Sequence, residues 1–582
     1  MTDSTPARPL DGARLLLWTG LLTGLAEGLI LTFRRFVQHQ SVWAPADVLW
    51  MAPLVYLTAA VPLALVAALA IRLAPRWCPW TRLAGVAGFL GAAVISAVLF
   101  GGVLHWSAHL MLAAGVGFQV SRRVAPPARA GRGLPWLAAL VLLVAVGLVA
   151  GGRFLERQTA RRAAAHPGRG PNVLLIIWDT VRAESLSLYG YVRPTTPETL
   201  RRAATGVTFE QAMSTAPWTL GSHAGMFTGR YTQELSVGWR EPLRTTAPTL
   251  AEELAARGYR TGGFVANLVA ASRESGLARG FGRYEDFPFT VGTAVRSTLL
   301  GQRLDRWPPF FRGGMRKYEP LRAAAITDNF LAWQGDGGGP WFAFLNYFDA
   351  HDPYYPPPDY RSRFQGPVRL LDKYDGAIEL LDRELARLLD TLAARGVLDS
   401  TIVILASDHG ELFGEHGLHQ HGNSLYSQVL HVPLVIWAPG RVPAGLRVNR
   451  EVSLRDLPAT VFDLAFPGAP HPFPGATLAR SWRDSAAPPD TILAGVPKGV
   501  NTPPEEPVTR GNMSAVLSGG LHYIVNGDGA LELFDRRADP AEASDLGTDP
   551  SRRGTMDTLH RALAARIPAA WHADTARGRG RP

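Results

Sequence analysis

Apolar stretches fill most of the first 150 residues of this chain. They run over Leu15–Phe33, Val48–Ile71, Leu83–Val120 and Leu134–Val149. Because a bilayer offers no water to backbone N–H and C=O groups, such stretches fold as membrane-spanning helices. The third would extend about 57 Å as one helix, nearly twice the thickness of a hydrocarbon core. We therefore expect two helices there, with a turn near Gly101 and Gly102, and five spans in all. The alternative is a buried helical bundle in a soluble protein.

The distribution of arginine predicts which side the rest of the chain faces. With the N-terminus inside the cell, the internal segments hold nine arginines and the external loops hold only Arg34 and Arg35. The positive-inside rule favours this topology, and five spans then place everything after them outside the cytoplasm. The arginines from Arg153 to Arg169 oppose it, although large translocated domains tolerate such charge. The sequence thus predicts a multi-pass protein of the cell membrane with an extracytoplasmic domain.

The remaining bulk properties exclude some classes of partner and of stabilisation. Cys78 is the one cysteine and falls in a predicted internal loop, so no disulfide framework exists. Much of the net charge of +10 flanks the spans, where it would meet anionic lipid headgroups. No pattern of basic and aromatic residues indicates nucleic-acid binding. The lipid bilayer is therefore the partner that the composition predicts.

The chain divides by composition into four parts. We expect a transmembrane region at 1–152, a linker at 153–170, a large domain at 171–485, and a C-terminal subdomain and tail at 486–582. From Asn172 onward, strand-like and helix-like segments alternate, which predicts a doubly wound, mostly parallel sheet with helices on both faces. Leu371–Leu392 is an amphipathic helix by its apolar spacing. Ala515–Phe534, around an Asn526–Gly529 turn, indicates a small antiparallel sheet.

Two apolar runs in the large domain end in an aspartate. Val173–Trp178 leads into Asp179, and Thr401–Ser407 leads into Asp408 and His409. Short, continuously apolar runs are typical of strands buried in a parallel sheet, and ligands bind at the carboxyl edge of such sheets. We therefore expect these three side chains to meet at one edge. Two carboxylates and an imidazole there predict a divalent-metal site.

A third segment, Ala216–Arg230, reads as a loop that opens a short helix. Thr219 near its start has an ordinary interpretation as the helix N-cap. The same position also favours an anion, and a metal could hold the hydroxyl there as an alkoxide nucleophile. Ser222 is the alternative nucleophile.

Taken together, the motifs resemble the sulfatase branch of the alkaline phosphatase superfamily over roughly residues 170–550. The matching motifs occur in family order: Pro171–Asp179, Tyr189-Gly190, Thr196-Pro197, Thr219–Gly229, His351-Asp352-Pro353, Ser407–Gly417, His421-Gly422, Leu425-Tyr426, Val432–Leu434, Leu533–Asp535 and Asp539-Pro540. The resemblance implies an alkaline phosphatase-type α/β fold and hydrolase or transferase activity.

The chain departs from true sulfatases at informative positions. Sulfatases carry a Cys or Ser, converted to formylglycine, at the position of Thr219, with Pro and Arg where this chain has Gly221 and His223. Thr180 replaces one carboxylate of their calcium site, and His421 replaces a catalytic lysine. What remains is similar to the single-metal centre of lipoteichoic acid synthases and phosphoethanolamine transferases, whose nucleophile is threonine.

That similarity implies a set of site residues. Asp179, Thr219, Asp408 and His409 would bind one divalent ion, and Thr219 would be the nucleophile. Oxygen and imidazole ligands suit Zn²⁺ or Mn²⁺ better than Ca²⁺, which stays an alternative. The Asp-x-x-x-His pair that bimetallic relatives use for a second ion is not apparent.

Other polar residues near these motifs have a structural and a functional interpretation. A lone histidine is more often structural, but His351 and His421 lie close to the motifs, and we assign both to the transferred group and its leaving oxygen. Glu415 and His416 are alternatives as partners of the metal ligands.

Three functional interpretations follow. The first is a membrane-anchored, metal-dependent hydrolase or transferase of phosphate esters, acting by phosphoryl or phosphoalcohol transfer, with a lipid donor or a cell-envelope glycan acceptor. The second is a sulfuric ester hydrolase with unmodified Thr219. The third is a catalytically inactive membrane scaffold, against which retention of the four presumed metal ligands argues.

Overall fold

The computed structural model describes residues 7–38, 42, 44–45, 47–101, 103–123, 133–165, 168–235, 237–239, 241–287, 290–304, 322–354, 356–361, 363–366, 369–484, 490–500, 502–568 and 571. The chain forms two compact units. The first combines residues 1–157 with 287–319, and the second combines residues 158–286 with 320–582.

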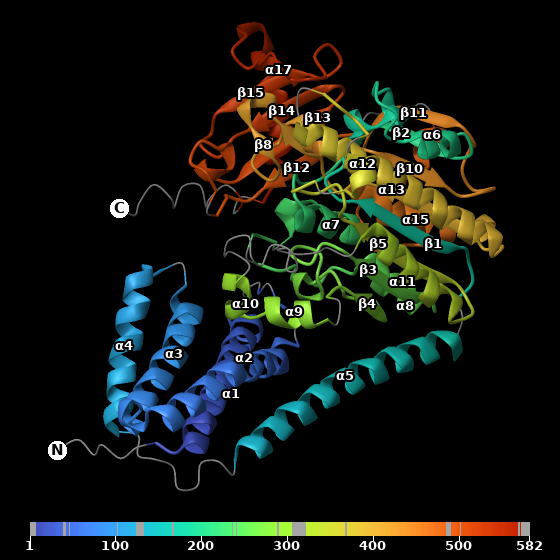
Figure 1. Ribbon diagram of the computed structural model, residues 1–582. Helices are drawn as coiled ribbons and strands as arrows, with labels where there is room; N and C mark the ends of the chain where they lie inside the picture. The colour runs from blue at the N-terminus through green and yellow to red at the C-terminus, as the bar shows by residue number, and fades with distance from the viewer. Residues whose placement is uncertain are drawn as a thin grey trace. The chain divides into compact units, whose positions relative to one another are not determined.

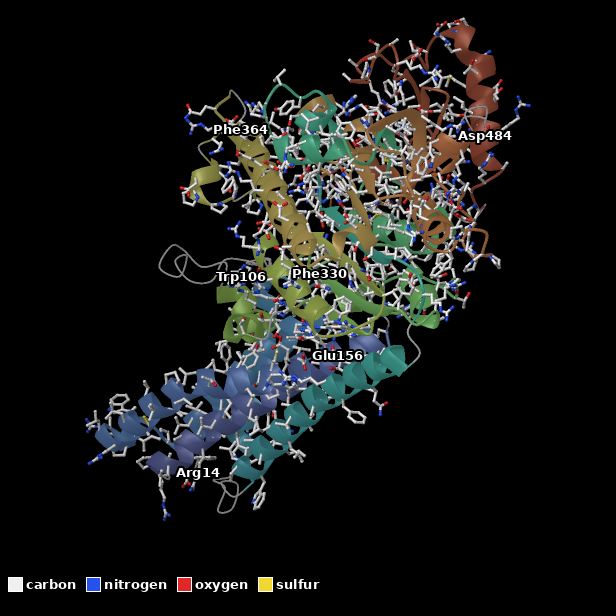
Figure 2. The ribbon with its side chains drawn as sticks, turned by 90° about the vertical axis from the view of Figure 1, so that its right-hand side faces the viewer. Arg14, Trp106, Glu156, Phe330, Phe364 and Asp484 are labelled. Atoms are coloured by element: carbon white, nitrogen blue, oxygen red, sulfur yellow. The ribbon has the colours of Figure 1, made fainter. Side chains whose placement is uncertain are left out.

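The first unit begins with five helices, as the sequence predicts: α1 (Pro9–Phe36), α2 (Val48–Leu73), α3 (Trp80–Phe100), α4 (Trp106–Arg123) and α5 (Leu134–Ala165) (Figure 1). Four of them, α1, α2, α3 and the Leu134–Glu156 part of α5, are long and apolar enough to cross a membrane. Large apolar side chains are exposed along these helices, and Arg14 and Trp106 lie near opposite ends of the bundle (Figure 2). These are the features of a membrane-embedded bundle.

The overlong apolar stretch is indeed divided into two helices. α3 ends at Phe100 and α4 begins at Trp106, close to the expected turn. The two helices approach closely through glycine: a Cβ at Gly117 would lie 2.7 Å from the Gly85 carbonyl oxygen, and one at Gly88 would lie 2.9 Å from Val120. Such close backbone approach is typical of helix pairs in membranes.

The second unit contains a nine-stranded, mostly parallel sheet, as expected. Its strands are β1 (Asn172–Trp178), β2 (Val207–Met213), β3 (Arg260–Val265), β4 (Arg283–Glu285), β5 (Trp341–Tyr347), β6 (Thr401–Ala406), β9 (His431–Val432), β10 (Leu434–Trp437) and β11 (Leu446–Ser453). The order is β11-β2-β10-β6-β1-β5-β3-β4, with β9 beside β2. The central strand β1 runs parallel to β5 and β6, whereas β10 is antiparallel to β6.

Helices cover both faces of this sheet. They are α6 (Pro197–Ala203), α7 (Thr219–Thr228), α8 (Leu250–Ala256), α11 (Ala323–Gly335), α12 (Pro358–Arg361), α13 (Arg369–Ala394), α14 (Ser427–Leu430), α15 (Leu457–Ala465) and α16 (Arg480–Arg483). Alternate residues of β1 enter different apolar clusters: Leu175 packs with residues of α7, α8 and α15, and Ile176 packs with residues of α11 and α13. This two-sided burial explains the continuously apolar sequence of the strand.

A small antiparallel sheet follows in the C-terminal part. It consists of β12 (Ile492–Val496), β13 (Met513–Ser518), β14 (Leu521–Val525) and β15 (Leu531–Asp535), and helix α17 (Arg553–Ala564) contacts it. The expected turn at Asn526–Gly529 joins β14 to β15. A two-stranded ribbon of β7 (Leu412–Phe413) and β8 (His419–Gln420) lies in the loop after β6.

The amphipathic helix α13 offers a test of the packing. Leu388 is fully buried against the sheet, whereas Leu370 of the same helix is 46% exposed. Leu388→Ala should lower the free energy of unfolding by about 2–5 kcal/mol because it leaves a cavity. Leu370→Ala should change it by less than about 0.5 kcal/mol. Chemical denaturation of the purified chain measures both, and equal effects would contradict this packing.

Candidate metal centre and active site

The ends of two strands and the start of one helix supply the candidate site. Asp179 follows β1, Asp408 and His409 follow β6, and Thr219 is the first residue of α7. Asp179, Asp408 and His409 offer ligand atoms that all lie within 4.8 Å of one another, and all three are fully buried. The expected meeting of these side chains at the carboxyl edge of the sheet is therefore observed.

The candidate ligand atoms surround the Nε2 atom of His409. This nitrogen lies 3.3 Å from Thr219 Oγ1, 3.4 Å from Asp408 Oδ2 and 3.8 Å from Asp179 Oδ1. His409 Nδ1 lies 3.0 Å from the Gly410 carbonyl oxygen. Because a carbonyl can only accept, Nδ1 carries the proton, and a neutral His409 then presents an Nε2 lone pair to the cluster.

Each carboxylate uses one oxygen for the protein and leaves the other free. Asp408 Oδ1 accepts the backbone N–H groups of Thr180 and His409 at 3.2 and 3.0 Å. Among the residues that the structure describes, Asp179 Oδ1 and Asp408 Oδ2, the two oxygens closest to His409, have no hydrogen-bond partner. Burying such atoms without a partner is costly, and a divalent cation is the partner that fits two carboxylates and an imidazole.

The pKa shifts express the same constraint. Burial, together with the charge of Asp179, raises the pKa of Asp408 well above the usual carboxyl range. Burial, together with the neighbouring His421, lowers the pKa of His409 well below the usual histidine range. The low dielectric of the interior disfavours both the carboxylate of Asp408 and the imidazolium of His409. A bound cation would offset the cost of the buried carboxylates.

Thr219 is a helical residue and not the N-cap. Trp218 occupies the N-cap position, and the Thr219 hydroxyl points to His409 instead of capping the helix. Ser222, the alternative nucleophile, is fully buried and accepts a hydrogen bond from Ser214 at 3.0 Å.

The residues that replace sulfatase motifs are accommodated locally. A Cβ at Gly221 would lie 2.7 Å from Trp218 Nε1, so the position admits no side chain without a shift. His223 is fully buried, with Nδ1 2.8 Å from the Thr219 carbonyl oxygen and 3.5 Å from Asp408 Oδ2. Burial lowers its pKa, so a neutral imidazole stands where sulfatases have arginine.

Thr180 supplies no ligand to the cluster. Its hydroxyl lies 2.7 Å from the Asp179 carbonyl oxygen and 3.1 Å from that of Ala350. Its backbone adopts φ = 64°, a left-handed conformation that β-branched residues rarely take, and its N–H reaches Asp408. The position thus supports Asp408 instead of adding a second carboxylate.

Two asparagines of the site were missed by the sequence analysis. Asn267 Nδ2 donates to Asp179 Oδ2 at 2.9 Å and to Thr219 Oγ1 at 3.2 Å. Its Oδ1 accepts the N–H groups of Val269 and Ala270, which fixes the orientation of the amide. Asn346 also donates to Asp179 Oδ2, at 3.1 Å. The position of Asn267, directly after the apolar strand β3, was the available signal.

His421 is held by a buried carboxylate that the sequence analysis also missed. Glu411 Oε1 lies 2.9 Å from His421 Nδ1, and Tyr354 OH donates to Glu411 Oε2 at 2.8 Å. Burial alone would lower the pKa of His421, but Glu411 outweighs it and raises that pKa. The ring centroid of His421 is 4.4 Å from that of His409. The raised pKa favours the protonated form of His421, whose ring lies beside the candidate metal ligands.

His351 lies in the same group of rings. Its ring centroid is 5.0 Å from that of His421, and it stacks on Phe348 at 4.1 Å. Burial and the neighbouring His421 lower the pKa of His351, so it is the neutral member of the pair.

Glu415 and His416 make their described contacts with residues outside the cluster. Glu415 pairs with Arg182 at 2.8 Å, and His416 stacks on Tyr426 with ring centroids 3.7 Å apart. Among the residues that the structure describes, neither hydrogen-bonds to Asp179, Asp408 or His409, so no such contact supports the alternative of second-layer partners.

Comparisons with known proteins identify the family of this part of the chain. A family model described as Sulfatase matches residues 171–468, just over half of the chain. The choline-sulfatase of Rhizobium meliloti is 31% identical over 194 residues, which cover 32% of this chain and 34% of that relative. An uncharacterized sulfatase of Escherichia coli, YidJ, is 24% identical over 456 residues, covering 68% of this chain and 86% of the relative.

A solved structure shares the fold. The phosphonate monoester hydrolase of Agrobacterium radiobacter superposes with a TM-score of 0.54 at 20% identity, covering 68% of this chain and 95% of that one.

The geometry predicts which buried carboxylates are required for metal binding. Asp408→Asn removes an anionic candidate ligand and should weaken metal binding by at least about tenfold. Even the substitution of a residue that only hydrogen-bonds to a metal ligand typically lowers metal affinity by about tenfold or more. Asp349→Asn is the matched control, since Asp349 is buried nearby but accepts the Ala323 N–H at 2.9 Å. Metal analysis of the purified chain after dialysis tests this, and wild-type metal content in Asp408→Asn would contradict it.

Proposed function

The chain belongs to the sulfatase family, and we propose that it is a membrane-anchored, metal-dependent hydrolase or transferase of phosphate esters with Thr219 as nucleophile. The observation that carries this proposal is the Thr219 hydroxyl, 3.3 Å from His409 Nε2 beside two buried, unpartnered carboxylate oxygens. A hydroxyl in that position is suited to attack phosphorus. Threonine cannot be converted to formylglycine, which argues against the usual sulfatase mechanism.

The residues that would hold the cation are Asp179, Thr219, Asp408 and His409. When bound, a Zn²⁺ or Mn²⁺ ion would neutralise the two carboxylates and favour ionisation of the Thr219 hydroxyl. Asn267 supports the same ionisation, because its amide N–H donates to Thr219 Oγ1 and stabilises negative charge there. His223 fixes the first turn of α7 through the Thr219 carbonyl oxygen.

The transfer then proceeds in two displacements. Thr219 Oγ1 loses its proton to solvent and forms a bond to phosphorus, while the bond from phosphorus to the leaving oxygen breaks. Protonated His421, oriented by Glu411, gives its proton to that oxygen, and His351 binds a non-bridging oxygen. Water or an acceptor hydroxyl next attacks phosphorus and returns a proton to His421, while the bond from phosphorus to Thr219 Oγ1 breaks and releases this oxygen as the alkoxide. The choice of attacking group decides between hydrolysis and transfer.

A sulfuric ester hydrolase with unmodified Thr219 is the second candidate. What favours it is that both curated relatives described above are named sulfatases. Sulfate and phosphate esters have similar shapes, so the same residues would act on either. An inactive scaffold is the weakest candidate. What counts against it is that Asp179, Thr219 and Asp408 each have an oxygen within 3.8 Å of His409 Nε2.

We also infer that α4 crosses the membrane, which gives five crossings. Its glycine contact with α3 supports this, since backbones approach so closely in membrane helix pairs. The distribution of arginine then orients the catalytic unit toward the extracytoplasmic side. A lipid donor or an envelope glycan acceptor is the substrate class that this location suggests.

The role of Thr219 is tested by two substitutions. Thr219→Ala should reduce kcat on an aryl phosphate or a bis-aryl phosphate by about a thousandfold or more, because no hydroxyl remains to attack. Thr219→Ser keeps a hydroxyl and should retain measurable turnover. Both are compared with wild type on aryl phosphate, bis-aryl phosphate and aryl sulfate. Turnover of aryl sulfate alone would establish the second candidate, and full activity of Thr219→Ala would exclude Thr219 as the nucleophile.

The role of His421 as proton donor predicts a dependence on the leaving group. Glu411→Gln weakens the proton donor, so turnover of an alkyl phosphate should fall by roughly a hundredfold. A nitrophenyl ester leaves without protonation and should lose much less. Glu415→Gln is the matched control, because this carboxylate of the same loop pairs with Arg182. Equal losses on the two esters would show that Glu411 serves the fold and not the departing oxygen.

A further inference from the structure

A buried carboxylate in the membrane unit is not among the residues of the candidate active site. Glu27 belongs to α1, one of the helices apolar enough to cross a membrane, and its exposed fraction is 2%. The sequences of α2, α3 and α4 contain no acidic residue. Acidic residues inside membrane helices are rare because a carboxylate in hydrocarbon is costly without a partner. Glu27 therefore calls for a specific partner.

Its partner is a segment from a distant part of the sequence. The backbone N–H of Leu299 donates to Glu27 Oε1 at 2.6 Å. The next N–H, that of Leu300, donates to the hydroxyl of Tyr56 in α2 at 3.3 Å. Two side chains from two membrane helices thus receive two consecutive backbone N–H groups.

The segment consists of two short helices, α9 (Val291–Arg296) and α10 (Leu299–Leu304). It follows β4 and precedes α11 in sequence, yet residues 287–319 group with the membrane unit. α9 lies against α2 and α10 contacts α3, so both are found beside the blue helices (Figure 1). Ala294 packs against an apolar cluster that includes Leu21, Trp50 and Met51. We call residues 290–304 the foot.

The contact lies well inside the membrane helices. Glu27 stands nine residues before the end of α1 at Phe36, and Tyr56 stands eight residues after the start of α2 at Val48. At 1.5 Å per residue, these positions are about 14 and 12 Å from the same end of the bundle. A hydrocarbon core is about 30 Å thick, so this depth is inside a membrane leaflet.

At that depth the two partners depend on each other. The N–H groups of Leu299 and Leu300 have no water to bond, and Glu27 has no other source of hydrogen bonds than the protein. Separation would leave a buried carboxylate and two bare N–H groups together, each of them costly in hydrocarbon. The pairing therefore fixes the foot in place more strongly than apolar contact alone would.

We propose that the membrane region is a docking base for the catalytic chain, and that Glu27 is the residue that fastens the foot to it. The chain then leaves the membrane unit through α5 before β1 and returns to it through the foot after β4. In sequence the foot follows β4, which pairs with β3, and Asn267 of the candidate site follows β3. This proposal does not depend on the chemistry of Thr219.

Hydrogen–deuterium exchange of the full-length protein in lipid nanodiscs tests the proposal. Glu27→Leu removes the acceptor, and the peptide containing residues 297–304 should exchange at least about tenfold faster than in wild type. Glu27→Gln keeps a carbonyl oxygen that accepts the Leu299 N–H and should retain wild-type protection. Asp11→Asn, the other acid of α1, is the control and should have no effect.

Tyr56→Phe provides a second test in case the Glu27→Leu variant does not fold. It removes the second acceptor and should speed exchange at Leu300 while leaving α3 and α4 protected. Wild-type protection of residues 297–304 in Glu27→Leu, or in Tyr56→Phe where that is the variant that folds, would overturn the proposal. So would equal exchange in Glu27→Gln and Glu27→Leu, because the acceptor oxygen would then be irrelevant.

Discussion

The catalytic unit depends on the burial of two carboxylates side by side. Asp179 and Asp408 are fully buried at the ends of neighbouring parallel strands, where each presents one unpartnered oxygen toward His409. Such a pair is unfavourable unless positive charge compensates it. The surrounding residues are arranged accordingly: Asn267 and Asn346 satisfy the outer oxygen of Asp179, and backbone N–H groups satisfy that of Asp408. One oxygen of each carboxylate remains uncompensated, and the charge of one divalent cation would balance the pair.

The residues that separate this chain from true sulfatases change the charge of the site consistently. Thr180 replaces a carboxylate and His223, with a lowered pKa, replaces an arginine, so one negative and one positive charge are lost together. The hydroxyl of Thr219 stands where sulfatases generate an aldehyde. These three positions lie in contact with Asp179 or Asp408, or with one another. Together they are consistent with the centre proposed above, in which a single metal ion supports an alkoxide nucleophile.

The sequence predicted the elements whose physical signal is local and strong. Continuously apolar runs identified β1 and β6, and the shared carboxyl edge of parallel strands brought Asp179 to Asp408. The sequence did not predict the roles of Asn267, Glu411 and Tyr354. A single polar residue in a loop has the same sequence pattern whether it forms a turn or contributes to a site. The division of the apolar stretch at Gly101 was predictable from length alone. The foot was not, because two six-residue helices carry too little periodicity to reveal that they pack among membrane helices.

The central claim is that Thr219 forms a covalent intermediate, and the stereochemical course at phosphorus tests it most directly. The purified protein would hydrolyse a chiral phosphorothioate ester in isotopically labelled water, and the configuration of the product would be determined. Each in-line displacement inverts phosphorus, so two successive displacements through Thr219 predict overall retention. Overall inversion would mean that water attacks the ester directly, and would contradict the account.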